Sequence, residues 1–252
     1  MRLPRFVATA LAAMAAAFIV PAQAQDPVAQ AVKLIGQYDY DGAIAILEPA
    51  CKAGNTEACW RLALAHSRNY SDESIAAADK QFLANCAKGD ARSCFMVADR
   101  VGYSDDPKDQ AKRNTGLTKA CNGGLGFACI QLGNSLEYNN DETKIDPDGA
   151  LRAFEKGCEL GFGAACSAAA ELYQQDRNGR TGDPLKGLPF AIKGCDLGDG
   201  SACAQIPSLE GLQLDEDTTP AQRQRWQGFH EKACRLGETD SCTIMLTKQL
   251  EL

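Results

Sequence analysis

A nine-residue frame, C-x-x-G-x-x-x-[AS]-C, occurs six times in the 252-residue sequence, and successive copies begin 35 to 39 residues apart. Self-similarity at this period is typical of a solenoid, in which each helix pair buries its apolar face against the next pair. The frame therefore constrains the fold more than any other feature does. The six copies read CKAGNTEAC, CAKGDARSC, CNGGLGFAC, CELGFGAAC, CDLGDGSAC and CRLGETDSC.

The positions in and around the frame predict two helices joined by a turn. A glycine stands three residues after every first cysteine, which indicates a left-handed backbone position that ends a helix. The residue before every second cysteine is Ala or Ser, which allows two helices to approach closely. Apolar residues recur three residues after the second cysteine and, in five of six copies, four residues before the first. In the sixth copy that last position is His230.

Helix starts are marked by a capping residue followed by proline. The pairs are Asp26-Pro27, Asp106-Pro107, Asp146-Pro147, Asp183-Pro184 and Thr219-Pro220. We therefore predict an all-α superhelical solenoid of six helix hairpins, each closed by a disulfide. The expected order is a signal peptide at 1–24, a capping helix in 25–37, and repeats at about 38–72, 73–105, 106–145, 146–182, 183–217 and 218–252. Pro189 and Pro207 fall inside helices of the fifth repeat, where proline is expected to kink a helix or end it early.

The first residues have the pattern of a secretory signal peptide. Arg2 and Arg5 precede an uncharged run from Phe6 to Val20, and Ala22-Gln23-Ala24 supplies the small residues of a cleavage site. An uncleaved anchor fits less well, because the run is shorter than the ~20 residues of a spanning helix. We expect cleavage after Ala24, no stable membrane anchor, and a periplasmic or secreted protein.

Twelve cysteines in an exported chain favour oxidised pairs. A zinc site would bring four ligands to one point, usually close-set cysteines and histidines, and the sequence holds only His66 and His230. A redox centre would favour C-x-x-C, which does not occur. Structural disulfides within each repeat fit best, and each closed loop would add about 2.5 kcal/mol in the chain-entropy model. The expected pairs are Cys51–Cys59, Cys86–Cys94, Cys121–Cys129, Cys158–Cys166, Cys195–Cys203 and Cys234–Cys242.

The frame and its period resemble the Sel1-like repeat, a relative of the tetratricopeptide repeat. More narrowly, they are similar to the disulfide-bridged Helicobacter cysteine-rich protein family, over roughly residues 38–252. The resemblance implies bridged cysteines in each repeat, a curved superhelix, and an adaptor that holds a protein or peptide on its concave side. Some members of the cysteine-rich branch carry a β-lactamase or penicillin-binding label.

The residues do not support catalysis. A serine β-lactamase needs S-x-x-K, and no serine here is followed by lysine three places on. His66 and His230 belong to the first and last repeats, so one chain cannot bring them together. No phosphate loop or nucleotide fingerprint occurs. We expect no enzyme, no catalytic residue, no cofactor and no metal site. The alternative, a β-lactam or peptidoglycan-fragment binder or weak hydrolase, rests on the family label alone.

Charge bounds the choice of partner. Without residues 1–24 the chain has 24 Lys and Arg against 33 Asp and Glu, a net charge of −9. Such a surface disfavours nucleic acid and favours a basic protein or peptide. We expect a monomeric scaffold in the periplasm, or alternatively a secreted factor that acts on a host. Tyr70, Tyr103, Tyr138 and Tyr173 follow the second cysteines of successive repeats and are expected to pack between repeats.

Overall fold

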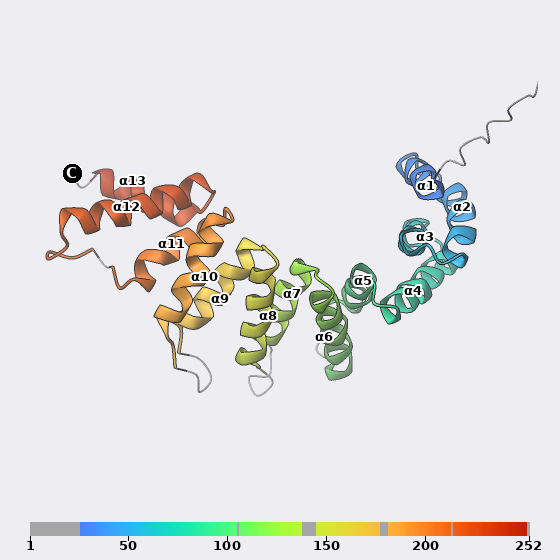
Figure 1. The fold of residues 1–252 in the computed structure, drawn as a ribbon, viewed down its shortest axis with the longest axis horizontal. Helices are drawn as coiled ribbons and strands as arrows, with labels where there is room; N and C mark the ends of the chain where they lie inside the picture. Colours follow the sequence, from blue (N-terminus) through green and yellow to red (C-terminus); the bar gives the residue numbers. More distant parts are fainter. Residues whose placement is uncertain (1–25, 105, 138–144, 177–180, 213, 251–252) are drawn as a thin grey trace, which may run out of the picture.

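A computed structural model describes residues 26–104, 106–137, 145–176, 181–212 and 214–250, within which the chain forms thirteen α-helices and no strand. The helices follow one another along an open arc, with α1 at one end and α13 at the other (Figure 1). Their bounds are α1 (Pro27–Gly36), α2 (Tyr40–Lys52), α3 (Thr56–Arg68), α4 (Asp72–Ala87), α5 (Ala91–Val101), α6 (Pro107–Asn122), α7 (Gly126–Glu137), α8 (Pro147–Glu159), α9 (Gly163–Gln174), α10 (Pro184–Asp196), α11 (Gly200–Leu209), α12 (Pro220–Arg235) and α13 (Thr239–Leu250).

The predicted fold class is confirmed. After α1, the helices form six hairpins from α2–α3 to α12–α13, and a disulfide joins the two helices of each hairpin. The principal contacts link consecutive helices and, more weakly, every second helix, such as α9 with α11. Each repeat therefore depends on its nearest neighbours, as in other solenoids. The expected signal peptide lies outside the described residues.

The residues before the prolines cap the first helices of the hairpins as predicted. Asp106, Asp146 and Asp183 each accept a hydrogen bond from a backbone N–H of the first turn, and Asp26 does the same for α1. Thr219 and Gln222 form a reciprocal capping box at the start of α12. A proline in the first turn costs no hydrogen bond, because the N–H it lacks has no partner within the helix.

Every hairpin turns through the same glycine motif. In the first repeat, Gly54 has φ +94° and donates its N–H to the Cys51 carbonyl, while Asn55 donates to the Ala50 carbonyl. This pair of bonds is a Schellman motif, which satisfies two carbonyls at a helix end. The same two bonds and a positive φ recur at Gly89, Gly124, Gly161, Gly198 and Gly237. The first cysteine of each frame is thus the penultimate residue of its helix and an acceptor in the turn.

The second helix of each hairpin begins two residues after the turn glycine, so that one residue lies between the glycine and the helix. In the first, second and fifth hairpins the residue after the glycine is Asn55, Asp90 or Asp199, and its side chain accepts the N–H of the small residue before the second cysteine. That small residue is buried in all six repeats. The second cysteine follows it as the fourth residue of the helix.

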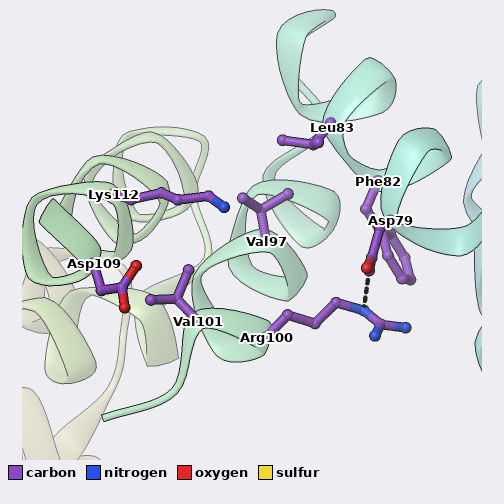
Figure 2. A pocket seen from close by; sticks show the side chains of 8 residues that line it. All are labelled: Asp79, Phe82, Leu83, Val97, Arg100, Val101, Asp109 and Lys112. Atoms are coloured by element: carbon purple, nitrogen blue, oxygen red, sulfur yellow. Dashed lines mark ion pairs between the residues drawn. The ribbon is translucent and has the colours of Figure 1, made fainter. Parts of the chain in front are cut away.

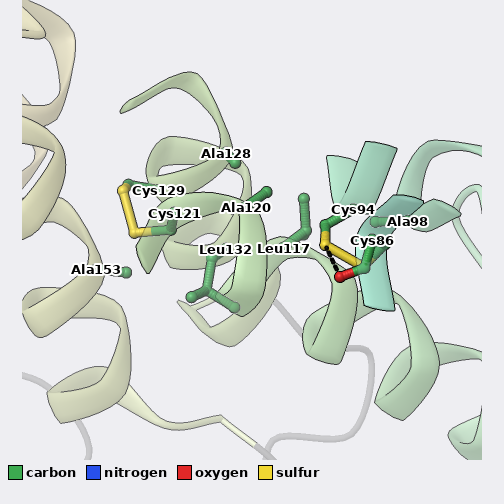
Figure 3. Close-up of a cluster of buried hydrophobic side chains, with 10 residues drawn as sticks. All are labelled: Cys86, Cys94, Ala98, Leu117, Ala120, Cys121, Ala128, Cys129, Leu132 and Ala153. Atoms are coloured by element: carbon green, nitrogen blue, oxygen red, sulfur yellow. Dashed lines mark hydrogen bonds between the residues drawn. A yellow bond between two sulfur atoms is a disulfide. The ribbon is translucent and has the colours of Figure 1, made fainter. Parts of the chain in front are cut away.

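Adjacent repeats are closely packed against each other at the disulfides. A Cβ built on Gly157 of α8 would lie 2.7 Å from Ala165 Cβ and 3.1 Å from Cys129 Cβ of the preceding repeat. A Cβ built on Gly194 of α10 would likewise lie 2.7 Å from Ala202 Cβ and 3.0 Å from Cys166 Cβ of the preceding repeat. Figure 3 shows two successive disulfides within one buried cluster that contains Leu117, Ala120, Leu132 and other side chains. The small residues therefore allow each repeat to lie directly on the disulfide of the previous one.

The two prolines of the fifth repeat leave their helices intact as secondary structure. α10 runs through Pro189, which removes the hydrogen bond to the carbonyl of Leu185, an exposed residue in the first turn. α11 contains Pro207 and ends two residues later, at Leu209. The expected early end is therefore wrong for α10, whereas α11 is the shortest of the second helices of the hairpins.

The close contact at Gly157 makes a testable prediction. The substitution Gly157→Ala should lower the free energy of unfolding, because overpacking a rigid site costs about 1–3 kcal/mol and the gain in helix propensity returns only about 1 kcal/mol. Gly228→Ala in α12 is the matched control, because a Cβ there would meet nothing within 4 Å. This control should be neutral or stabilising in urea unfolding of the oxidised proteins. Equal stabilisation by both substitutions would contradict the close contact.

Candidate functional site

The twelve cysteines singled out by the sequence form six disulfides, and none is free. Each bond joins residues eight positions apart, with Cα atoms 4.5 to 4.7 Å from one another. It links the penultimate residue of one helix to the first turn of the next. The cysteines thus hold the hairpins closed.

The disulfides differ in how far they are buried. The four central bonds, from Cys86–Cys94 to Cys195–Cys203, have both cysteines buried. Cys234 and Cys242 of the last repeat are only partly buried, and Cys51 of the first repeat is as well. For the last repeat the difference follows from stacking: Gly157 and Gly194 of following repeats lie against Cys129 and Cys166, whereas α13 is the last described helix.

The two histidines do not come together. His66 lies in α3 of the first repeat and His230 in α12 of the last. His230 fills the core position that is apolar in the other repeats: it is 7% exposed, its ring centroid lies 4.2 Å from that of Trp226, and Nδ1 lies 2.9 Å from the Ser241 hydroxyl. Burial lowers the pKa of both histidines, against a weaker opposing effect of a nearby glutamate. Neither is placed for shared chemistry.

A groove between the second and third repeats is a candidate for binding. It has a volume of about 410 Å³ and lies among α4, α5 and α6. Figure 2 shows Leu83, Val97 and Val101 around this space, with the Lys112 side chain directed into it. Leu83 is 52% exposed, a large fraction for a leucine, so apolar surface is available to a partner.

Charged groups border the same groove. Arg100 Nε lies 2.6 Å from Asp79 Oδ1, and the Arg100 guanidinium lies 5.9 Å from the centre of the Phe82 ring beneath it. Asp109, on α6, accepts a hydrogen bond from Ser104. The groove therefore combines an apolar floor with positive and negative groups at its rim, which suits a polypeptide better than a purely apolar ligand.

The tyrosines that follow the second cysteines differ in their exposure and in their contacts with the next repeat. Tyr173 packs between repeats as expected: its hydroxyl donates to Glu155 and its ring stacks on Phe190 of the next repeat. The packing expectation is wrong for Tyr70, which is 82% exposed at a turn with φ +57°. Tyr103 is also largely exposed, although its ring and hydroxyl contact the next repeat. Tyr138 lies outside the described residues.

Within the described part of the chain, no group of three or more His, Cys, Asp or Glu side chains could hold a metal ion. In the same residues, no helix is both long enough and apolar enough to cross a membrane.

The arrangement defines a class: an α/α solenoid whose hairpins are each closed by a disulfide. No protein-family model and no curated protein matches the sequence. Among solved structures, the fold is similar to a Sel1 repeat protein from Oxalobacter formigenes, with a TM-score of 0.64 and 19% identity over 83% of this chain and 85% of that one. It is also similar to c5321, a protective antigen of uropathogenic Escherichia coli strains that displays an SLR fold, with a TM-score of 0.62 and 20% identity over 83% of this chain. The matched part spans 44% of the antigen's length. The fold is therefore that of Sel1-like repeats.

Sequence reasoning did not find the groove or the buried polar contacts between repeats. Asn85 stands immediately before a first cysteine, where the other repeats have Ala or Gly. It is buried and donates its side-chain N–H to the Cys59 carbonyl of the preceding repeat. The sequence shows that Asn85 differs from the residues at the same position of the other repeats. Its hydrogen-bond partner cannot be found in this way, because the partner depends on how the repeats stack.

The burial pattern predicts an order of reduction. Under native conditions Cys234–Cys242 should react with dithiothreitol before the four central disulfides, because attack requires access of a thiolate to a sulfur atom. Timed alkylation followed by peptide mass spectrometry would measure each bond. In denaturant the difference should disappear. Early reduction of Cys158–Cys166 in the native protein would contradict the stacking described here.

The buried histidines predict a pH dependence of stability. A histidine whose pKa is lower in the folded state than its ordinary value of 6.5 binds fewer protons when folded. Its contribution is therefore fully present above about pH 6.5 and is lost as the pH falls below that value. His230→Asn keeps a polar partner for Ser241 but cannot titrate, so it should weaken the fall in urea midpoint between about pH 7.5 and 5.5. An unchanged slope in both His230→Asn and the double variant with His66→Asn would reject this explanation.

Proposed function

We propose that the protein is an exported scaffold, held by its disulfides, that binds a protein or peptide partner through its curved surface. The observation that carries the proposal is the groove among α4, α5 and α6, where the half-exposed Leu83 and two valines meet charged groups at the rim. The Sel1-like repeat fold supports it, because solenoids of this kind present extended surfaces to polypeptides. The narrower resemblance to the Helicobacter cysteine-rich family is part of the proposal.

The compartment is proposed on chemical grounds. Six disulfides persist best in an oxidising environment, such as the periplasm or the outside of the cell. The signal-peptide pattern before Gln25 agrees with this location. The excess of acidic residues favours a basic partner, which would be steered toward the surface while an apolar side chain enters the groove. We further propose that the scaffold acts as a monomer, without a membrane anchor and without catalysis.

Cross-linking and co-purification test this function. The mature, tagged protein would be isolated from its own compartment, and the proteins that accompany it would be identified and quantified. Leu83→Asp should reduce capture of a stoichiometric partner by about tenfold or more, as expected for a central position of an interface. Leu246→Asp in α13 is the matched control, because Leu246 is also an exposed leucine but lies outside the groove.

Three other outcomes would each change the proposal. A partner captured equally well by Leu83→Asp would place binding elsewhere on the arc. Capture that persists after reduction and unfolding would show that the folded scaffold is not needed. If no protein is enriched, the scaffold proposal fails, and turnover of a chromogenic β-lactam by the purified protein then tests the alternative of a β-lactam or wall-fragment binder or hydrolase.

A further inference from the structure

A second, smaller pocket lies on the other side of α5. It has a volume of about 150 Å³ and is lined by residues from α5, the following turn, α6 and α7. On α5 the groove uses Val97, Arg100 and Val101, whereas this pocket uses Phe95 and Asp99. At 100° per residue these sets face roughly opposite directions, so the pocket is separate from the groove.

The pocket contains a buried arginine. Arg113 of α6 is 8% exposed and lines the cavity. No carboxylate among the described residues lies within ion-pair distance of its guanidinium, although the chain carries an excess of acidic residues. Its hydrogen bond within this part of the chain runs from Nη2 to Gln131 Oε1, at 3.2 Å. A guanidinium has five N–H donors, so four are not used by these neighbours.

The neighbours fix the orientation of that guanidinium. The Tyr103 ring centroid lies 4.4 Å from Arg113 Cζ, so an aromatic ring covers part of the group. Gln131 Oε1 also accepts the Tyr103 hydroxyl hydrogen at 3.2 Å. A guanidinium held by a ring and an amide offers its remaining donors at its edge, which is the geometry for binding a planar anion with two parallel hydrogen bonds.

We infer that this pocket binds a carboxylate group. Charge selects a carboxylate over a phosphate, because the exposed Asp99 also lines the pocket and would repel a dianion more strongly than a monoanion. Size agrees, since the cavity admits a small group rather than a large cofactor. Phe95, Leu117 and Phe127 supply apolar walls beside the guanidinium. The inference goes beyond the proposed function and does not rest on it.

The NMR resonance of the Arg113 side chain provides the test. Mature protein with intact disulfides and labelled arginine would be titrated with four probes while the Nε–H resonances of Arg113 and Arg100 are followed by NMR. N-acetylleucine carries a main-chain carboxylate, N-acetylisoglutamine a side-chain carboxylate, N-acetylleucinamide none, and inorganic phosphate is the competing anion. We expect saturable shifts of Arg113, with at least one carboxylate binding at about 10 mM or below, and no such shift with the amide.

Variants identify the residue responsible. Arg113→Gln should weaken carboxylate binding by about tenfold or more, because a charge-assisted pair of hydrogen bonds is lost. Arg100→Gln is the matched control and should bind as the wild type does. If Arg113→Gln does not fold, the titration of the unaltered protein still decides. The inference fails if neither carboxylate moves the Arg113 resonance, or if phosphate or the amide binds as well as the carboxylates. Leu83→Asp should leave this binding intact, so failure here and failure of the proposed scaffold are separate results.

Discussion

The close contact between each disulfide and the helix of the next repeat is the constraint on which the array depends. A repeat of this size buries too little apolar surface to fold alone, so stacking must supply the core. Stacking at this distance requires a small residue before each second cysteine and, in the fourth and fifth repeats, glycine at 157 and 194. The disulfide therefore both closes its hairpin and provides the surface on which the next one packs.

This packing still leaves hollows at the surface between neighbouring helices. Two of the hollows lie in the second and third repeats, where the groove around Leu83 and the pocket around Arg113 are on opposite sides of α5. They differ in chemistry, since the first offers apolar surface with a mixed rim and the second a buried cation. A regular scaffold can thus hold two unlike surfaces between one pair of adjacent hairpins, because side chains exposed between the stacked helices are free to vary.

The sequence determined the repeating parts of the fold and could not determine the singular ones. The left-handed conformation at Gly161 and the burial of Ala165 were predictable, because the same chemistry recurs at the same place in six copies. The effect of Pro189 could not be predicted in this way: α10 continues through it, because the hydrogen bond that it removes lies in the exposed first turn. Arg113 stands eight residues before a first cysteine, where four of the other five repeats have Ala or Gly. Its partners, Gln131 of the same hairpin and Tyr103 of the preceding repeat, depend on how the helices pack. Only the packing of the helices shows that its side chain is buried and forms no ion pair with the acidic residues that the structure describes.

The nine-residue loops closed by the disulfides also change how the chain would respond to a pulling force. Each disulfide removes eight residue steps from the path between the two ends, and the six together remove 48. At about 3.4 Å per residue each closed loop would span about 27 Å, whereas the bond that replaces it spans 4.5 to 4.7 Å between Cα atoms. A pulled chain would therefore reach roughly 135 Å less than its length suggests. The cross-links are local, so none ties one repeat to another. Under a pulling force the hairpins would unfold one after another. The disulfides would keep each turn closed and so limit the extended length of the chain.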